Sequence, residues 1–379
     1  MKKMIIKNGT TYNPFTKEFD KKNIAINGNK IVETPREINK DWNILDATNC
    51  IIVPGLIDYH IHLYTGCDGG VPPDIATLPN GVTTAVDGGT CGVSNYELFE
   101  KYDITNSRVR IKSYLHVSPT GLATTAYTEN EDPKYYDLDK MRELFDKYRD
   151  HLIALKFRIS KDIVRSSGLT REPLEKTIEI AEVLKCKVVV HMNDPIIPIE
   201  DVADMLRPGD VFCHMYHGMG DTIIDNSGLV KKRILEARKR GIIFDACNGR
   251  SNFSFKIAIP AIKNEFIPDI ISTDMSPMTL YEHPVINLPR LLSKYLNMGI
   301  DIKKIFDMVT ITPAKQIGME EELGSLNIGT VADIAIFKII EKQIKFYDYL
   351  GEYINGNQVI IPQMTIKDGK IMYRQTDFN

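Results

Sequence analysis

The middle of the chain, from about residue 51 to residue 313, alternates between short apolar runs and longer amphipathic segments. Eight runs have the length of buried strands: 51–57, 83–87, 110–117, 152–159, 187–192, 210–215, 241–246 and 269–273. Segments rich in Lys and Glu with helical spacing lie between most of them, for example 139–150, 172–184, 228–240 and 288–297. Strands that alternate with helices predict an α/β fold, a parallel sheet covered by helices.

Eight parallel strands are the number that closes a barrel, so we expect a (β/α)8 TIM barrel. A doubly wound open sheet is the alternative. It ranks lower because no Gly-rich phosphate-binding fingerprint follows the first apolar run, which ends near residue 57.

Both ends of the chain have a different pattern, with short β-type runs separated by tight turns. Asn8-Gly9, Asn27-Gly28 and Asp368-Gly369 are strong hairpin signals. Chain ends often lie close together. The sequence therefore predicts a small β-sandwich domain formed by residues 1–50 and 325–379, beside a barrel of residues 51–324.

Composition narrows the class of protein. With 43% hydrophobic and 26% charged residues, and 47 basic against 50 acidic side chains, the chain is typical of a globular protein without a nucleic-acid partner. No apolar run approaches the ~20 residues that cross a bilayer. The start lacks a signal-peptide pattern, and the six cysteines show no CxxC spacing. We therefore expect reduced thiols, a cytoplasmic location and no membrane partner.

Five of the eight predicted strands end in or near a side chain that can bind a metal ion. In this fold the carboxyl ends of the strands meet at the active site. The candidates, of which four are among only eight histidines in the chain, are His60, His62, Lys156, His191, His214 and Asp274.

His60 and His62 are two residues apart, so on a strand both imidazoles face the same side and could reach one metal. Such pairs occur by chance on surface hairpins, but this one follows a buried run. Lys156 lies inside an apolar strand, where an unpaired ammonium is costly. A salt bridge would relieve this cost. The functional alternative is a neutral amine that captures CO₂ and becomes a carbamate able to bridge two metals.

His191 and His214 end consecutive strands, which favours metal ligation over the more common role of a buried core histidine. Asp274 follows the last strand. It could cap the next helix, but its position indicates a metal ligand and general base, the catalytic residue. Imidazole nitrogens and carboxylate-type oxygens suit Zn²⁺, with manganese, iron and cobalt left open.

These motifs resemble the amidohydrolase superfamily, in particular the segments 55–62 and 324–333 together with Lys156, His191, His214 and Asp274. The resemblance implies two divalent metal ions. His60 and His62 would hold the more buried ion, and His191 and His214 the more exposed one. A carboxylated Lys156 and a hydroxide would bridge the two ions, and Asp274 would ligate the buried ion and transfer the proton.

Within the superfamily the chain is similar to a branch labelled dihydroorotase-like or deacetylase-like. This similarity implies a metal-dependent hydrolase that cleaves an amide or ester bond, by deacylation of an N-acyl amino acid or acyl hydroxy acid. We expect Arg158, two residues after Lys156, to bind a substrate carboxylate, although an outer salt bridge is the alternative. Asn248, His217 and Ser251 are further candidates for substrate contact, and His116 lies either in the pocket or in the core.

Two other functions stay open. One is a deaminase or cyclic amidohydrolase, adenine deaminase-like or dihydroorotase-like, because the same scaffold supports that hydrolysis. The other is a non-catalytic barrel with a structural or interaction role. The presence of every expected metal ligand argues against this second alternative. The expected partner is a small-molecule substrate, and fold analogy favours a homo-oligomer.

Overall fold

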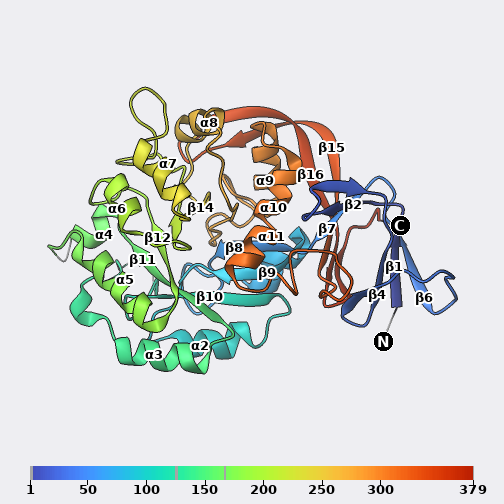
Figure 1. The fold of residues 1–379 in the computed structure, drawn as a ribbon, viewed down its shortest axis with the longest axis horizontal. Coiled ribbons are helices and arrows are strands. Elements are labelled where there is room, and N and C mark those ends of the chain that lie inside the picture. The colour runs from blue at the N-terminus through green and yellow to red at the C-terminus, as the bar shows by residue number, and fades with distance from the viewer. Residues whose placement is uncertain (1–2, 124–126, 166–167, 379) are drawn as a thin grey trace.

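Seven parallel strands lie side by side in a curled sheet at the centre of the computed structural model, which describes residues 3–123, 127–165 and 168–378 (Figure 1). They follow the order of the chain: β8 (Leu56–Ile61), β9 (Val82–Asp87), β10 (Arg110–His116), β11 (Leu152–Arg158), β12 (Lys187–His191), β13 (Val211–Cys213) and β14 (Ile243–Asp245). Each strand pairs in parallel with the next, with register shifts between β8 and β9 and between β10 and β11. Six of the strands match predicted apolar runs.

Residues 270–275 fill the eighth position and close the sheet. Ile270 bridges Asp245 at the end of β14, and Met275 bridges Ile61 at the end of β8, both in parallel orientation. The run 269–273 thus lies where the eighth strand was predicted, but it pairs through single bridges in place of a regular strand. The fold is the predicted (β/α)8 barrel.

Helices cover the outside of the barrel (Figure 1). They are α1 (Pro73–Thr77), α2 (Tyr96–Phe99), α3 (Leu138–Lys147), α4 (Lys161–Val164), α5 (Glu172–Leu184), α6 (Ile199–Met205), α7 (Lys232–Lys239), α8 (Phe255–Lys263), α9 (Leu288–Asn297), α10 (Ile302–Met308) and α11 (Ile311–Gln316). The side chains of Asp137 and Asn287 cap the first turns of α3 and α9. Among the described residues, no helix has the length and apolar character needed to span a membrane.

The two chain ends together form two further sheets beside the barrel. One contains β5 (Lys30–Val32), β4 (Ile24–Asn27), β1 (Lys3–Lys7) and β6 (Trp42–Asp46). The other contains β17 (Lys370–Arg374), β16 (Tyr353–Lys367), β15 (Ile334–Tyr347), β7 (Ile51–Pro54), β2 (Thr10–Asn13) and β3 (Glu18–Asp20). Apolar side chains of both sheets share one core, which includes Ile6, Ile26, Ile52, Ile336 and Ile366. This is the predicted β-sandwich.

The apolar run 51–57 is two strands and not the single barrel strand that its composition predicts. Ile51–Pro54 is β7 of the sandwich, and the barrel begins with β8 at Leu56. Gly55 lies between them, where a β-carbon would come within 2.2 Å of Thr83 Oγ1. The change of sheet therefore depends on the close approach that glycine permits.

The hairpin of β15 and β16 is longer than the sequence indicates. It leaves the sandwich and extends over the barrel toward α8 and α9 (Figure 1). At its tip, the carboxylate of Asp348 accepts a hydrogen bond from the backbone N–H of Phe255 at 3.1 Å. The tip thereby contacts the first residue of α8.

Candidate metal centre

The six predicted ligands converge at the carboxyl ends of the barrel strands. His60 lies on β8, Lys156 on β11 and His191 on β12. His62 and His214 directly follow β8 and β13, and Asp274 lies within the closing segment. The parallel barrel brings them together because it collects all strand ends at one rim. His60 and Asp274 are 214 positions apart in the sequence, yet Nε2 of His60 lies 3.7 Å from Oδ1 of Asp274.

His60, His62, Lys156 and Asp274 form one half of the cluster. His62 Nε2 is 3.1 Å from Asp274 Oδ1, and His60 Nε2 is 3.2 Å from Lys156 Nζ. One potential ligand atom from each of His60, His62 and Asp274 lies within 4.8 Å of the other two. A single cation placed among them would contact all three.

His191 and His214 form the other half of the cluster. Their rings are 4.2 Å apart between centroids, and the ring of His214 is 5.7 Å from that of His60. The Nε2 atoms of both residues are buried and have no hydrogen-bond partner within the described structure. Buried polar atoms without a partner cost about 1–3 kcal/mol each, so these two nitrogens fit a missing ligand.

Hydrogen bonds at the opposite ring nitrogen fix the tautomer of two of these histidines. The Thr90 hydroxyl donates to Asp87 Oδ2 at 2.7 Å, so its oxygen accepts from His62 Nδ1 at 2.8 Å. His214 Nδ1 donates to the carbonyl of Cys247 at 2.7 Å. Each Nε2 therefore keeps a lone pair for a metal ion.

The contact between His62 and Asp274 supports the same conclusion. With Nδ1 protonated, Nε2 presents a lone pair to a carboxylate oxygen 3.1 Å away. Two acceptors at this separation repel unless a cation lies beside both. The four imidazoles, the carboxylate and the Lys156 side chain thus form a donor set that fits divalent metal ions.

Burial favours the neutral form of two of the four imidazoles. It lowers the pKa of His60 to about 4, with the nearby Lys156 charge as the second cause, and it lowers the pKa of His191 well below its usual value. For Asp274, burial acts to raise the pKa, but the neighbouring imidazoles, with His62 first among them, outweigh it and hold the pKa well below the usual range. Neutral histidines and an ionised carboxylate are the protonation states that metal binding requires.

A cavity of about 650 Å³ opens over the cluster, and His60, His62, Lys156, His191 and Asp274 form part of its wall. A volume of this size holds a small molecule. Arg158 and Ser251 also line it, in agreement with their predicted positions. Arg158 already has partners, because its Nη1 contacts Glu129 Oε1 at 3.1 Å and its Nη2 is 3.9 Å from Asp162 Oδ2.

Asn248 and His217, the other two predicted substrate contacts, are outside the set of residues that line the cavity. Asn248 is buried, and its Oδ1 accepts hydrogen bonds from Lys294 Nζ at 2.7 Å and Tyr295 Oη at 3.2 Å. His217 is fully buried. His116 lines the cavity, and its Nδ1 accepts from the backbone N–H of Ser118 at 3.1 Å.

Several residues that support the centre were not singled out from the sequence: Asp87, Thr90, Glu129 and Asn252. Asn252 donates from Nδ2 to Asp274 Oδ2 at 2.9 Å and so orients the carboxylate. Asp87 ends β9, so its place at the carboxyl end of a strand was a usable signal. Thr90, Glu129 and Asn252 lie in loops, where no periodic pattern marks them.

Comparisons with known proteins identify the family of the chain. The model of the amidohydrolase family matches residues 51–372. A deacetylase of Agrobacterium fabrum is 32% identical over 329 residues, which cover 86% of this chain and 80% of that protein. A deacetylase of Brucella anthropi is 31% identical over 340 residues, or 89% of this chain and 82% of that protein.

Two solved structures share the fold over nearly their full length. A crystal structure of an adenine deaminase superimposes with a TM-score of 0.90 at 25% sequence identity. The match covers 98% of this chain and 99% of the deaminase chain. A crystal structure of a dihydroorotase gives a TM-score of 0.88 at 28% sequence identity, and the match covers 99% of this chain and 98% of the dihydroorotase chain. Amidohydrolases generally hold a binuclear centre of divalent metals. This chain belongs to the amidohydrolase family and is a metal-dependent hydrolase that acts on C–N bonds.

Proposed function

We propose that the enzyme removes the acyl group, most simply acetyl, from a small carboxylate-bearing substrate, an N-acyl amino acid or an acyl hydroxy acid. The observation that carries this proposal is Arg158, which lines the cavity on the same strand as Lys156 and two residues beyond it. A guanidinium group beside the scissile bond is suited to a carboxylate. The two related deacetylases support the acyl group as the part that leaves.

We assign the metal ligands as follows: His60, His62 and Asp274 for the more buried ion, and His191 and His214 for the more exposed one. Lys156 would bridge the ions after its amine attacks CO₂, which forms an N–C bond and releases one proton. Zn²⁺ suits this set of nitrogen and oxygen donors. When bound, the two ions supply a hydroxide at neutral pH and polarise the carbonyl that it attacks.

Side chains of the protein would transfer the proton and orient the substrate. Asp274, held at Oδ2 by Asn252, would accept the proton of the attacking hydroxide and pass it to the leaving nitrogen or oxygen. Arg158 orients the substrate through its carboxylate, in competition with Glu129. Ser251 lines the cavity and is a further substrate contact, whereas Asn248 and His217 would act only after a rearrangement.

Deamination of a purine-like ring is the second candidate, favoured by the close match to an adenine deaminase structure. Both reactions use the same hydrolytic centre, and the leaving group distinguishes them. The cytoplasmic location and the homo-oligomer stay predictions from composition and fold analogy.

A substrate panel with the metal-loaded enzyme separates these candidates. We would measure acetate released from N-acetyl amino acids and O-acetyl hydroxy acids of both hands, ammonia released from adenine, and ring opening of dihydroorotate. The proposal expects acetate from a carboxylate-bearing class, with a preference for one hand. Ammonia from adenine with no acetate from any acyl compound would contradict it.

A further inference from the structure

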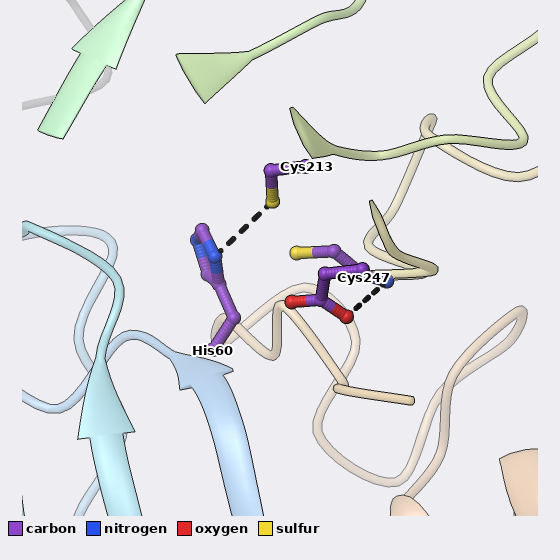
Figure 2. Close-up of side chains that lie close together, drawn as sticks. His60, Cys213 and Cys247 are labelled. Carbon is purple, nitrogen blue, oxygen red and sulfur yellow. Dashed lines mark hydrogen bonds between the residues drawn. The ribbon is translucent and has the colours of Figure 1, made fainter. Parts of the chain in front are cut away.

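A second group of potential metal ligands lies in the barrel interior, beside the hydrolytic centre. It consists of Cys213 on β13, Asp245 on β14, Cys247 just beyond β14 and His60 on β8. All four side chains are buried, and one ligand atom from each lies within 4.8 Å of the others. Figure 2 shows both thiols directed toward the space beside the His60 ring.

The ring of His60 faces both groups through different nitrogens. Its Nε2 is 3.2 Å from Lys156 Nζ, on the side of the hydrolytic centre. Its Nδ1 is 3.3 Å from the sulfur of Cys213, as the dashed line in Figure 2 marks. One nitrogen therefore remains for a second site when the other binds the hydrolytic metal.

The donor set is that of a closed zinc-type site. Two thiols, one imidazole nitrogen and one carboxylate make four donors, the number that tetrahedral Zn²⁺ takes, and thiolates select soft or borderline cations. With metal bonds of about 2.0–2.3 Å, tetrahedral donors lie roughly 3.3–3.8 Å apart. The observed limit of 4.8 Å leaves small movements of the side chains to close the site.

Simple packing is the alternative, because a free cysteine often serves as a small buried hydrophobe. Asp245 argues against it. Its oxygens accept hydrogen bonds from the Ser272 hydroxyl at 2.8 and 2.7 Å and from the backbone N–H of Cys247 at 3.0 Å, all neutral donors. A fully buried carboxylate beside two thiols gains most from a cation.

We propose that Cys213, Asp245, Cys247 and Nδ1 of His60 bind a thiophilic divalent cation such as Zn²⁺, in addition to the hydrolytic metals. Binding would release the protons of the two thiols and of Nδ1. The site needs no substrate and shares only His60 with the hydrolytic centre. It would hold that ring from the side opposite Lys156 and connect β8, β13 and the end of β14.

Cobalt provides a direct test, because thiolate ligation to Co²⁺ gives a charge-transfer band in the near ultraviolet. The full-length protein is stripped with a chelator and titrated with Co²⁺, and bound metal is counted. We expect the band and one equivalent beyond the hydrolytic pair. C213S/C247S should lose both the band and that equivalent, whereas C50S, a buried cysteine of the sandwich core, should keep them.

The wild-type titration decides the matter even if the double variant does not fold. Saturation without a charge-transfer band would overturn the proposal, as would a band that survives in C213S/C247S. Lys156→Ala separates this site from the proposed function, since it should weaken the hydrolytic centre and leave the band. Hydrolysis without the band would contradict only this proposal, and a band in an enzyme without hydrolase activity only the proposed function.

Discussion

At the scale of single residues, the second nitrogen of each imidazole decides how well a metal can be held. His62 depends on Thr90, whose oxygen accepts from Nδ1 while its own proton is used by Asp87. Such partners fix the ring and its tautomer, and their loss commonly weakens metal affinity about 10–100-fold. Thr90 is therefore as much a part of the centre as its ligands.

T90V tests this role, because valine keeps the shape of threonine and removes the acceptor. We expect metal affinity to fall about 10–100-fold, measured by competition with a chromophoric chelator, while the fold is retained. T105V, at a site on the exposed surface, is the matched control. Unchanged affinity in T90V would mean that the ring of His62 is held by other contacts.

Arg158 and Glu129 give a prediction about substrate binding. Removing the guanidinium in R158M should raise KM for a carboxylate substrate by about 10–100-fold, the equivalent of roughly 1.5–3 kcal/mol for a hydrogen bond to a charged group. E129Q should lower KM, since Arg158 would no longer be neutralised by its neighbour. R149M, far more exposed, serves as control. Equal KM values in all three variants would remove Arg158 from the substrate site.

The convergence of the six candidate ligands could be predicted from the sequence because strand ends meet at one rim in a parallel barrel and because buried His and Lys are rare. Thr90 and Asn252 could not, since their positions depend on loops whose paths leave no periodic trace. Glu129 lies in such a loop and pairs with Arg158 on β11, 29 positions further along the chain. The contact of Asn248 with Lys294 could not be predicted either, because the two residues are 46 positions apart and no pattern links them.

At the scale of elements, the alternation of apolar runs and helices predicted the barrel. The exact bounds of its first strand and the pairing of its last segment depend on single contacts. Gly55 divides one apolar run into two strands, and the closing segment near Ile270 pairs through bridges alone. The β15–β16 hairpin was underestimated because its outer half is polar and exposed on the surface. Apolar side chains of the extended part, among them Phe346 and Ile360, pack into the main hydrophobic core.

Asp348 is the contact that fastens the hairpin tip. Its carboxylate accepts from the backbone N–H groups of Phe255, Leu350 and Glu352. D348A should lower the free energy of unfolding by about 1–3 kcal/mol and speed amide hydrogen exchange at the tip, because the buried N–H group of Phe255 and two N–H groups of the tip lose their acceptor. D139A, which removes an almost fully exposed carboxylate, is the control. Exchange at the tip that matches wild type would show that Asp348 does not fasten it.

At the scale of the whole molecule, one buried acid should make global stability depend on pH. Burial, reinforced by the charge of Glu129, raises the pKa of Glu131 from 4.5 to about 8. The folded chain then keeps a proton that the unfolded chain has lost. This contribution to stability is full below pH 4.5 and disappears as the pH rises to about 8.

E131Q should remove this dependence, because the amide stays neutral and can still accept a hydrogen bond from Tyr136. Relative to E131Q, the wild type should become less stable with rising pH by at most about 1.4 kcal/mol per pH unit, measured by urea unfolding at constant metal concentration. E143Q, an exposed site, is the control. Parallel stability curves for wild type and E131Q would show that Glu131 titrates normally.

The most direct test of the whole account is the metal content of the wild-type enzyme and of Lys156→Ala, purified side by side and analysed for elements. The account predicts that the variant holds at least one equivalent less per chain and loses hydrolysis, because the bridge between the two halves of the centre is gone. K176A, a surface lysine on α5, should match the wild type. Equal metal content in Lys156→Ala and wild type would contradict the central claim that Lys156 joins two metal ions at this rim.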